Sequence, residues 1–231
     1  MLVKTVLVVF RNWPLRTVEI NQFRGYLNEQ LAWQDDFFHN HTSEPGGVIY
    51  RYPRIHYRSF RGRATLFGIQ EGYDAIDALI RTQVDRQPDR FGAVERLEQR
   101  TNLRLDDSLH TYTLHQWMGL NTIKNRDGSV TDLMAIWQDL PDEARRWQLL
   151  ERSLTAQLLK FCGEMGVRLP RGELCVQIRA VGDAGRHRLR SQTGQPPFQA
   201  FDVRYESNLV LPDYVAFGKG VSKGFGWQTG H

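Results

Sequence analysis

Residues 2–10 read LVKTVLVVF, an almost continuous apolar run that is rich in valine. A run of this length and composition is typical of a strand buried on both faces. The turn signal Asn12-Trp13-Pro14 closes it. We therefore expect the chain to begin with a central strand, and the order of the elements that follow decides the fold.

Those elements alternate between helical and strand-like patterns. Asn21 can cap a helix that runs to about Gln34, and Gly25 within it indicates close approach of another backbone. The later expected elements are a strand over 48–57, a return strand over 64–69, a helix over 73–82, a polar loop over 85–103 and a strand over 109–119. Strand, helix, strand, strand, helix, strand is the ferredoxin-like split βαβ order, which RNA-recognition modules share.

The second half can be a degenerate copy of the same arrangement. Pro141, Asp142 and Glu143 suit the start of a helix with an apolar stripe that runs to about Met165. The remaining expected elements are a strand over 173–181, a Gly- and Arg-rich loop over 182–195, one or two strands within 198–209 and a glycine-rich terminus over 218–226.

Composition favours a globular protein with a phosphate-bearing partner. The chain has 231 residues, 41% of them hydrophobic, a net charge of +4 and a pI near 9.2. Most of its cations are arginine, whose planar fork suits phosphate oxygens. No apolar run approaches the about 20 residues that a membrane helix needs. Cys162 and Cys175 stand in no metal spacing, so we expect reduced core thiols in a cytoplasmic protein.

The stretch Phe37–Tyr57, FFHNHTSEPGGVIYRYPRIHY, carries the chemistry-bearing residues. His39 and His41 permit three interpretations: ordinary surface histidines, metal ligands, or an acid–base pair that moves protons near neutral pH. No neighbouring Asp, Glu or Cys set completes a metal shell with obvious spacing. RNA suits the acid–base interpretation because its own 2′-OH is a nucleophile.

Two further groups of residues can bind RNA. Arg51, Arg54, Arg58, Arg61 and Arg63 alternate with aromatic residues that could stack on bases, or they could form a solvated strand. Arg186, Arg188 and Arg190 resemble a phosphate clamp on a loop that orders on binding. The terminus GKGVSKGFG adds six candidates that favour an anion-facing loop over a plain hairpin: Gly218, Lys219, Gly220, Lys223, Gly224 and Gly226.

Together these motifs resemble the CRISPR-associated repeat-RNA endoribonucleases of the RAMP superfamily. The similarity is greatest to subtype b of the sixth CRISPR-associated family. The motifs that carry it span nearly the whole chain: Phe23-Arg24-Gly25, Phe38-His39-Asn40-His41, Tyr50-Arg51-Tyr52-Pro53, Trp117–Asn121 and LPDYVAFGKGVSKGFG.

The resemblance implies an α+β protein of two tandem ferredoxin-like (RRM-like) domains, which we place at residues 1–118 and 119–231. It also implies metal-independent cleavage of precursor CRISPR RNA within the repeat, leaving a 2′,3′-cyclic phosphate and a 5′-hydroxyl. The catalytic residues would be His39 and His41, with Tyr50 assisting and Tyr52 as an alternative. No cofactor is implied, and a homodimer and binding to effector-complex subunits are further expectations.

Two other functions fit the sequence. The chain could be a non-catalytic RNA-binding subunit of a CRISPR effector complex, which the histidine pair disfavours. It could also be a metal-dependent phosphoesterase that uses the histidines as ligands.

Overall fold

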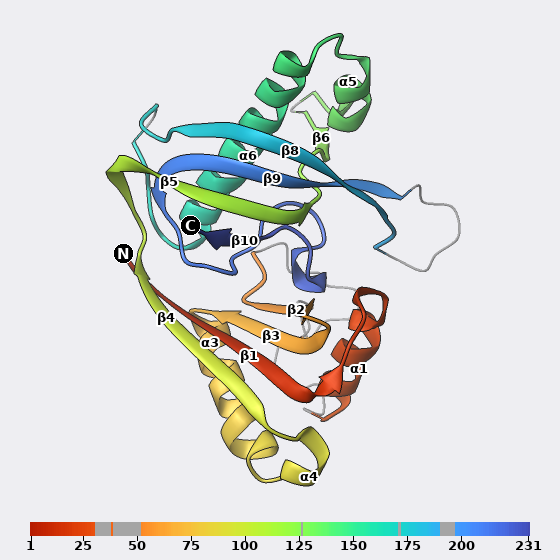
Figure 1. Ribbon diagram of the computed structural model, residues 1–231. Helices are drawn as coiled ribbons and strands as arrows, with labels where there is room; N and C mark the ends of the chain where they lie inside the picture. Colours follow the sequence, from red (N-terminus) through yellow and green to blue (C-terminus); the bar gives the residue numbers. More distant parts are fainter. Residues whose placement is uncertain (31–37, 39–51, 126, 171, 190–196) are drawn as a thin grey trace. The chain divides into compact units, whose positions relative to one another are not determined.

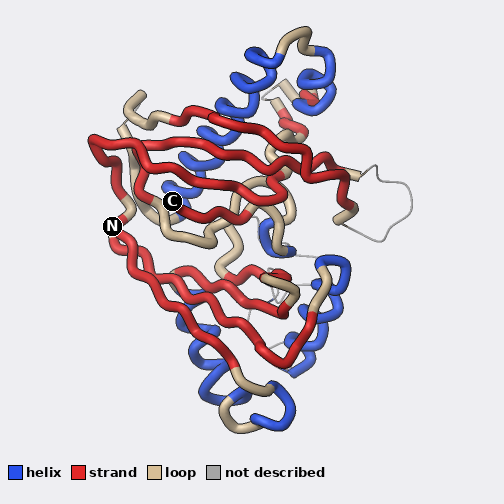
Figure 2. Tube along the Cα trace, in the orientation of Figure 1, coloured by secondary structure: helices blue, strands red, loops and turns tan. Residues whose placement is uncertain are grey.

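The computed structural model describes residues 1–30, 38, 52–125, 127–170, 172–189 and 197–231 (Figures 1 and 2). Its contacts divide it into two compact units. The first unit is Met1–Asn102 with Ser222–Gly224, and the second is Leu103–Val221 with Phe225–His231. None of the helices in the described ranges is long and apolar enough to cross a membrane.

The first unit has the predicted split βαβ topology. Its strands form one antiparallel sheet in the order β2-β3-β1-β4. The strands are β1 (Leu2–Pro14), β2 (Ile55–Phe60), β3 (Arg63–Ile69) and β4 (Val94–Asn102). The helices are η1 (Thr17–Glu19), α1 (Ile20–Gln30), α3 (Glu71–Leu79), the π-helical turn η2 (Ile80–Val84) and α4 (Pro88–Phe91).

Alternate residues of β1 build the core of this unit. Val6, Val8 and Phe10 are fully buried and pack in one cluster with residues from the helices α1 and α3. Phe10 meets Phe23 of α1 edge to face, with ring centroids 5.7 Å apart. The alternate buried residues of β1 therefore pack against the apolar face of α1, as expected for a sheet covered by helices on one face. At Gly25 of α1, an added Cβ would meet no described atom within 4 Å, so the predicted close approach of a backbone is wrong for the described residues.

The structure corrects the prediction between residues 85 and 119. The expected polar loop contains α4 and the edge strand β4, which pairs with β1 along its whole length. The expected fourth strand is instead β5 (Arg104–Trp117), which belongs to the second sheet. The two compact units divide between Asn102 and Leu103, before β5, whereas the predicted boundary at residues 118 and 119 falls after it.

The second unit repeats the same strand order. Its sheet is β10-β5-β9-β8, again antiparallel throughout. The prediction of two tandem ferredoxin-like domains in an α+β protein is therefore confirmed. The elements beyond β5 are β6 (Thr122–Lys124), β7 (Val130–Asp132), α5 (Leu133–Asp139), α6 (Glu143–Glu164), β8 (Val176–His187), β9 (Phe198–Val210), η3 (Val221–Lys223) and β10 (Trp227–Gly230).

Two departures from the plain ferredoxin order distinguish this unit. The hairpin β6–β7 and the helix α5 are inserted between β5 and α6. The connection from β9 to β10, residues 211–226, is fully described and contains only the short turn η3 where the order expects a second helix. Both departures prove important for the surface of this unit.

The helix α6 provides the core of the second unit. The Asp142 side chain accepts a hydrogen bond from Arg145 N (2.8 Å), which caps the helix start near the predicted position. Leu154 and Leu158 are fully buried on its apolar stripe, as predicted. Cys162 on the same stripe is buried, and burial raises the pKa of its thiol to about 11. Cys175 is also a free cysteine but is exposed, so its assignment as a core thiol is wrong.

A buried hydroxyl in the first unit yields a stability test. The Tyr57 hydroxyl lies 3.2 Å from Phe38 O and 3.3 Å from Asn28 Oδ1, and all three residues are buried. We expect Tyr57→Phe to lower the free energy of unfolding by about 1–3 kcal/mol, because buried acceptors would lose their donor. Chemical denaturation monitored by circular dichroism would measure the change.

Tyr26→Phe is the matched control, because the Tyr26 hydroxyl accepts an exposed hydrogen bond from Arg90 Nε. Its cost should stay within about 0.5 kcal/mol, as for most surface changes. Equal, small effects of both substitutions would contradict the assignment of a stabilising role to the Tyr57 hydroxyl.

Candidate nucleic-acid interface

The residues predicted to perform the chemistry lie outside the described part of the chain. His39, His41 and Tyr50 fall within residues 39–51, as does Arg51, and Arg190 begins the second excluded stretch, 190–196. The described site is therefore the surface that surrounds the glycine-rich connection of the second unit.

Glycines let this connection sit directly against neighbouring backbone. Gly218, Gly220 and Gly226 have φ values of +86°, +78° and +68°, a region that side chains strongly disfavour. A Cβ at Gly218 would lie 2.7 Å from Met118 O, and one at Gly226 would lie 1.9 Å from Phe217 O. The glycines are thus required by a left-handed backbone and by close packing at the same time.

Four amides of this segment already have backbone acceptors. Lys219 N donates to Met118 O (3.0 Å), and Gly226 N donates to His115 O (3.0 Å). Phe217 N and Phe225 N likewise donate to carbonyls of the loop itself, at 2.8 and 3.3 Å. These four amides hold the loop in place and are not available to bind an anion.

The side chain of Lys219, unlike its amide, lies on the surface of the loop. Lys219 is exposed, and its ammonium lies 3.9 Å from the centroid of the Phe198 ring, within cation–π range. Phe198 is the first residue of β9 and is partly exposed. Proteins that bind single-stranded RNA combine cations, which contact the phosphates, with accessible aromatic rings, on which the bases stack.

The strand β8 brings arginines to the same end of the sheet. It continues through residues 182–187, which the sequence predicted to be a loop, and Arg186 pairs in register with Gln199 of β9. Arg186 and Arg188 are both exposed. The structure thus places Arg186 opposite Gln199 and next to Phe198, at the start of β9.

A small apolar cluster joins the loop to these strands. Phe225 of the loop packs with Met118 at the end of β5 and with Leu189 and Phe198 near the β8–β9 end. A Cβ at Gly220 would lie only 2.8 Å from Leu189 Cδ2. We call Arg186, Arg188, Phe198, Lys219 and the glycines 218 and 220 the basic end of the second sheet. The sequence analysis did not name Phe198 as a site residue. The signal that could have found it is its position at the start of the strand expected after the arginine-rich stretch.

Lys223 and Gly224 belong to Ser222–Gly224, which groups with the first unit. Lys223 ends the turn η3 and is partly exposed, whereas Gly224 is buried with φ +85°.

The arginine cluster of the first unit divides by exposure. Arg58 is completely buried, and its Nη2 donates to His56 Nδ1 (3.2 Å). Arg54 forms an ion pair with Glu71 (3.1 Å), and 13% of its side chain is exposed. Arg61 and Arg63 are exposed and line a shallow cavity of about 490 Å³ beside Phe60. Of the described members of this cluster, Arg61 and Arg63 are therefore the exposed ones.

His56 is buried and neutral beside Arg58. Burial, followed by the charge of Arg58, lowers its pKa well below the ordinary value of 6.5. Its Nε2 lies 3.0 Å from Pro53 O while its Nδ1 faces the Arg58 guanidinium. The donor at Arg58 fixes Nδ1 as the acceptor and Nε2–H as the donor, so both ring nitrogens serve the fold.

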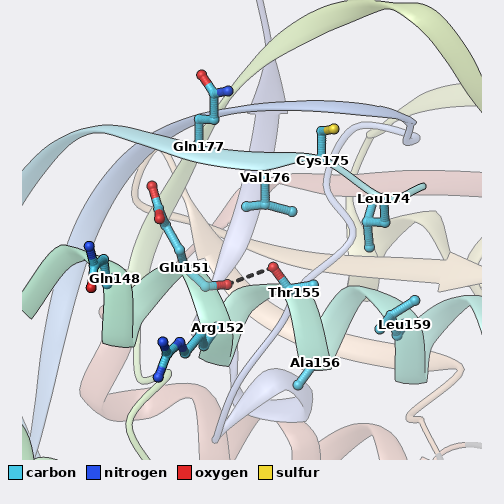
Figure 3. A pocket seen from close by; sticks show the side chains of 10 residues that line it. All are labelled: Gln148, Glu151, Arg152, Thr155, Ala156, Leu159, Leu174, Cys175, Val176 and Gln177. Carbon is cyan, nitrogen blue, oxygen red and sulfur yellow. Dashed lines mark hydrogen bonds between the residues drawn. The ribbon is translucent and has the colours of Figure 1, made fainter. Parts of the chain in front are cut away.

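The described residues of the second unit line several cavities, three of which are relevant to the surface. One of about 280 Å³ borders the basic end and is lined by Arg186 and Phe198. A second, of about 490 Å³, lies among α5, α6 and the strands β8 and β9. The third, of about 580 Å³, separates α6 from the start of β8; Figure 3 shows Val176 pointing toward the helix and Cys175 away from it. Among the described residues, no group of three or more His, Cys, Asp or Glu could hold a metal ion.

The fold defines a class: an α+β protein of two tandem ferredoxin-like domains, the second of which carries a glycine-rich connection. Family comparison narrows this class. The Cas6b N-terminal domain model matches residues 1–86, and the Cas6b C-terminal domain model matches residues 104–229. The chain therefore belongs to the Cas6b family of CRISPR RNA processing endoribonucleases, which confirms the predicted family and class of activity.

Solved structures agree on the fold. A crystal structure of Cas6b has a TM-score of 0.75 at 18% identity, and one of the CRISPR RNA processing endoribonuclease Cas6b has 0.69 at 19%. Csf5, a type IV CRISPR-Cas Cas6 crRNA endonuclease, has 0.66 at 14%. Each comparison covers 100% of both chains. A comparison with curated proteins finds no match.

The buried histidine gives a pH test of the first unit. The pKa of His56 is 6.5 when unfolded and well below that when folded, so only the unfolded state gains a proton as the pH falls below 6.5. We expect stability to fall by up to about 1.4 kcal/mol per pH unit from this one site. Denaturation between pH 7.5 and 5.0, compared with His56→Gln, should show a shallower decline in the variant. Identical slopes would contradict a neutral buried His56.

Proposed function

We propose that the chain cleaves precursor CRISPR RNA within each repeat by metal-independent transesterification. The observation that carries the proposal is the match of both Cas6b domain models, because the first includes the segment that bears His39, His41 and Tyr50. The partner of the site is CRISPR repeat RNA, and the setting is the cytoplasm. Association with effector subunits and a homodimer belong to the same proposal.

The proposed reaction needs only proton transfer and charge stabilisation. One histidine of the pair His39 and His41 removes the 2′-OH proton, and the 2′-oxygen forms a bond to phosphorus. The bond from phosphorus to the 5′-oxygen breaks, and the other histidine protonates that leaving oxygen. Tyr50 steadies the phosphate. The products are a 2′,3′-cyclic phosphate and a 5′-hydroxyl, so no water or metal enters the step.

RNA binding in this proposal is spread over both units. The exposed side chains Arg186, Arg188 and Lys219 contact phosphates at the basic end, and Phe198 offers a stacking surface. Gly218, Gly220 and Gly226 shape that surface, and the Gly226 amide already donates to His115 O. Further proposed contacts come from Arg51, Arg54, Arg190, Lys223 and Gly224.

The catalytic assignment is tested by removing both histidines. His39→Ala with His41→Ala should abolish cleavage of the repeat RNA, by at least about 10⁴-fold if both proton transfers are lost, and should leave the dissociation constant nearly unchanged. Gel analysis under single-turnover conditions and a binding assay would measure the two effects. Full cleavage by the double variant, or loss of wild-type cleavage in EDTA, would contradict the mechanism.

The same reaction distinguishes the other functions. A non-catalytic RNA-binding subunit would bind the repeat without a defined cut. A metal-dependent phosphoesterase would lose activity with chelator and recover it with metal. Product ends carrying a 2′,3′-cyclic phosphate identify the proposed reaction.

The basic end is tested by the salt dependence of binding. Lys219→Ala and Arg186→Ala should each weaken RNA binding and reduce the slope of log K against log salt by about 0.7, the value for one single-strand phosphate contact. Lys160→Ala is the matched control, because Lys160 is also an exposed cation of the second unit but lies on α6. Equal slopes for all three variants would remove the basic end from the RNA interface.

A further inference from the structure

The second cavity of the second unit, about 490 Å³, has a lining unlike that of the basic end. It lies among the inserted helix α5, the first turns of α6 and the strands β8 and β9. Its walls include three aromatic side chains: Trp137 of α5, Trp147 of α6 and Phe201 of β9. The insertion therefore supplies a cavity wall that the plain ferredoxin order lacks.

Packing holds the Trp137 indole in a fixed position. Its ring meets Phe201 edge to face at 5.2 Å, and the Arg146 guanidinium lies 5.1 Å from its centroid. Arg146 is itself fixed by donating from Nε to Leu140 O (3.2 Å). A planar group entering the cavity would thus meet a preorganised aromatic wall, which lowers the entropy cost of stacking.

The indole N–H of Trp137 has an unmet hydrogen-bonding requirement. It is buried and finds no acceptor among the described residues. Buried polar groups in proteins are nearly always paired, and an exception calls for a ligand, a water or a functional reason. An acceptor atom on a ligand in this cavity would meet that requirement.

The charges of the lining argue against phosphate as the occupant. The lining includes two carboxylates, those of Glu143 and Asp183, and one guanidinium, that of Arg146. Hydrogen bonds from Gly185 N (2.7 Å) and then from Gln199 Nε2 (2.6 Å) lower the pKa of Asp183, which keeps it ionised. Carboxylates accept from amino donors, so this cavity suits a planar ligand that carries both donors and acceptors.

We infer that this cavity binds one unpaired nucleobase of the repeat RNA, one that carries an exocyclic amino group. The bases that qualify are cytosine, adenine and guanine, whose amino edges suit a carboxylate, whereas uracil has none. Aromatic stacking on unpaired bases is the usual mode of single-stranded RNA recognition. The inference rests on the proposed function, and it adds a position at which this chain reads sequence.

Continuity with the basic end supports the assignment. Gln199 lines this cavity and also the smaller one, which Arg186 and Phe198 line. A strand whose phosphates contact the basic end would therefore pass within reach of the aromatic cavity. The basic end then positions the backbone, and the cavity reads one base.

The test combines an abasic scan with variants of the lining. A CRISPR repeat RNA that the chain binds is made with one abasic site at each unpaired position in turn, and the dissociation constant is measured with the full chain. One position should weaken wild-type binding by about tenfold or more. Trp147→Ala should bind the intact RNA more weakly and lose the sensitivity to that one abasic site.

A second variant keeps the test valid if Trp147→Ala folds poorly. Glu143 is exposed at the start of α6, and Glu143→Gln should reduce the preference for an amino-bearing base over uracil at the same position. Leu159→Ala is the control, because Leu159 is exposed on the same helix but lines the cavity between α6 and the start of β8. It should retain both the affinity and the abasic response.

The outcomes separate this inference from the proposed function. Two results, each obtained while the wild type still cleaves the repeat, would overturn the base cavity alone. One is that no abasic position weakens binding, and the other is that the sensitive position weakens binding equally in Trp147→Ala. Absence of both binding and cleavage by the wild type would overturn the proposed function and the identity of the ligand with it.

Discussion

The hydrogen bond from Lys219 N to Met118 O anchors the surface on which this account depends. It fixes the glycine-rich connection to the end of β5, and Gly218 permits the contact because any Cβ there would lie 2.7 Å from the same carbonyl. Lys219 can then lie over Phe198, and Phe225 can pack with Leu189. Without this hydrogen bond and the packing that it permits, the loop would not be held against the β8–β9 end, and the cations of the two segments would not lie on one surface.

The ferredoxin-like order explains how one topology supports two different tasks. In the first unit, the helices α1 and α3 cover the sheet, and the buried Arg58 donates from Nη2 to His56 Nδ1 within it. In the second unit, the helix between the last two strands is replaced by the glycine-rich connection, which leaves room for exposed cations. The insertion before α6 adds aromatic and acidic groups nearby. The two units thus share a strand order and differ in their connections, which are the segments that commonly carry function in such folds.

Local patterns predicted the elements whose signals are local. The valine-rich run predicted β1, the apolar stripe over Leu154 and Leu158 predicted α6, and the glycines predicted a loop over residues 218–226. The edge strand β4 was missed because it pairs through its backbone with β1 only, and exposed ionic side chains such as Glu95, which pairs with Arg11, hide the alternation. β8 was cut short because glycine and arginine at 182–186 resemble a loop, whereas long-range pairing with β9 keeps them in the sheet.

The site was predicted in composition but not in arrangement. The sequence proposed Arg186, Lys219 and the glycines, but it could not show that the amides of Phe217, Lys219, Phe225 and Gly226 already donate to carbonyls. It also grouped Arg58 with surface cations, although Arg58 is buried against Phe67 at 5.1 Å. Which groups are buried or already bonded is a property of tertiary contacts, and no local spacing encodes it. The family resemblance, carried by motifs along the whole chain, reached further than the spacing did.

Ultraviolet crosslinking of the repeat RNA to the full chain, with the crosslinked peptides read by mass spectrometry, tests the central claim most directly. The central claim is that the basic end of the second sheet is the RNA surface. The account predicts crosslinks at Phe198 and within residues 217–225, and their loss in Lys219→Ala at moderate salt. Crosslinks confined to the cavity between α6 and the start of β8, around Cys175 and Leu159, would contradict it.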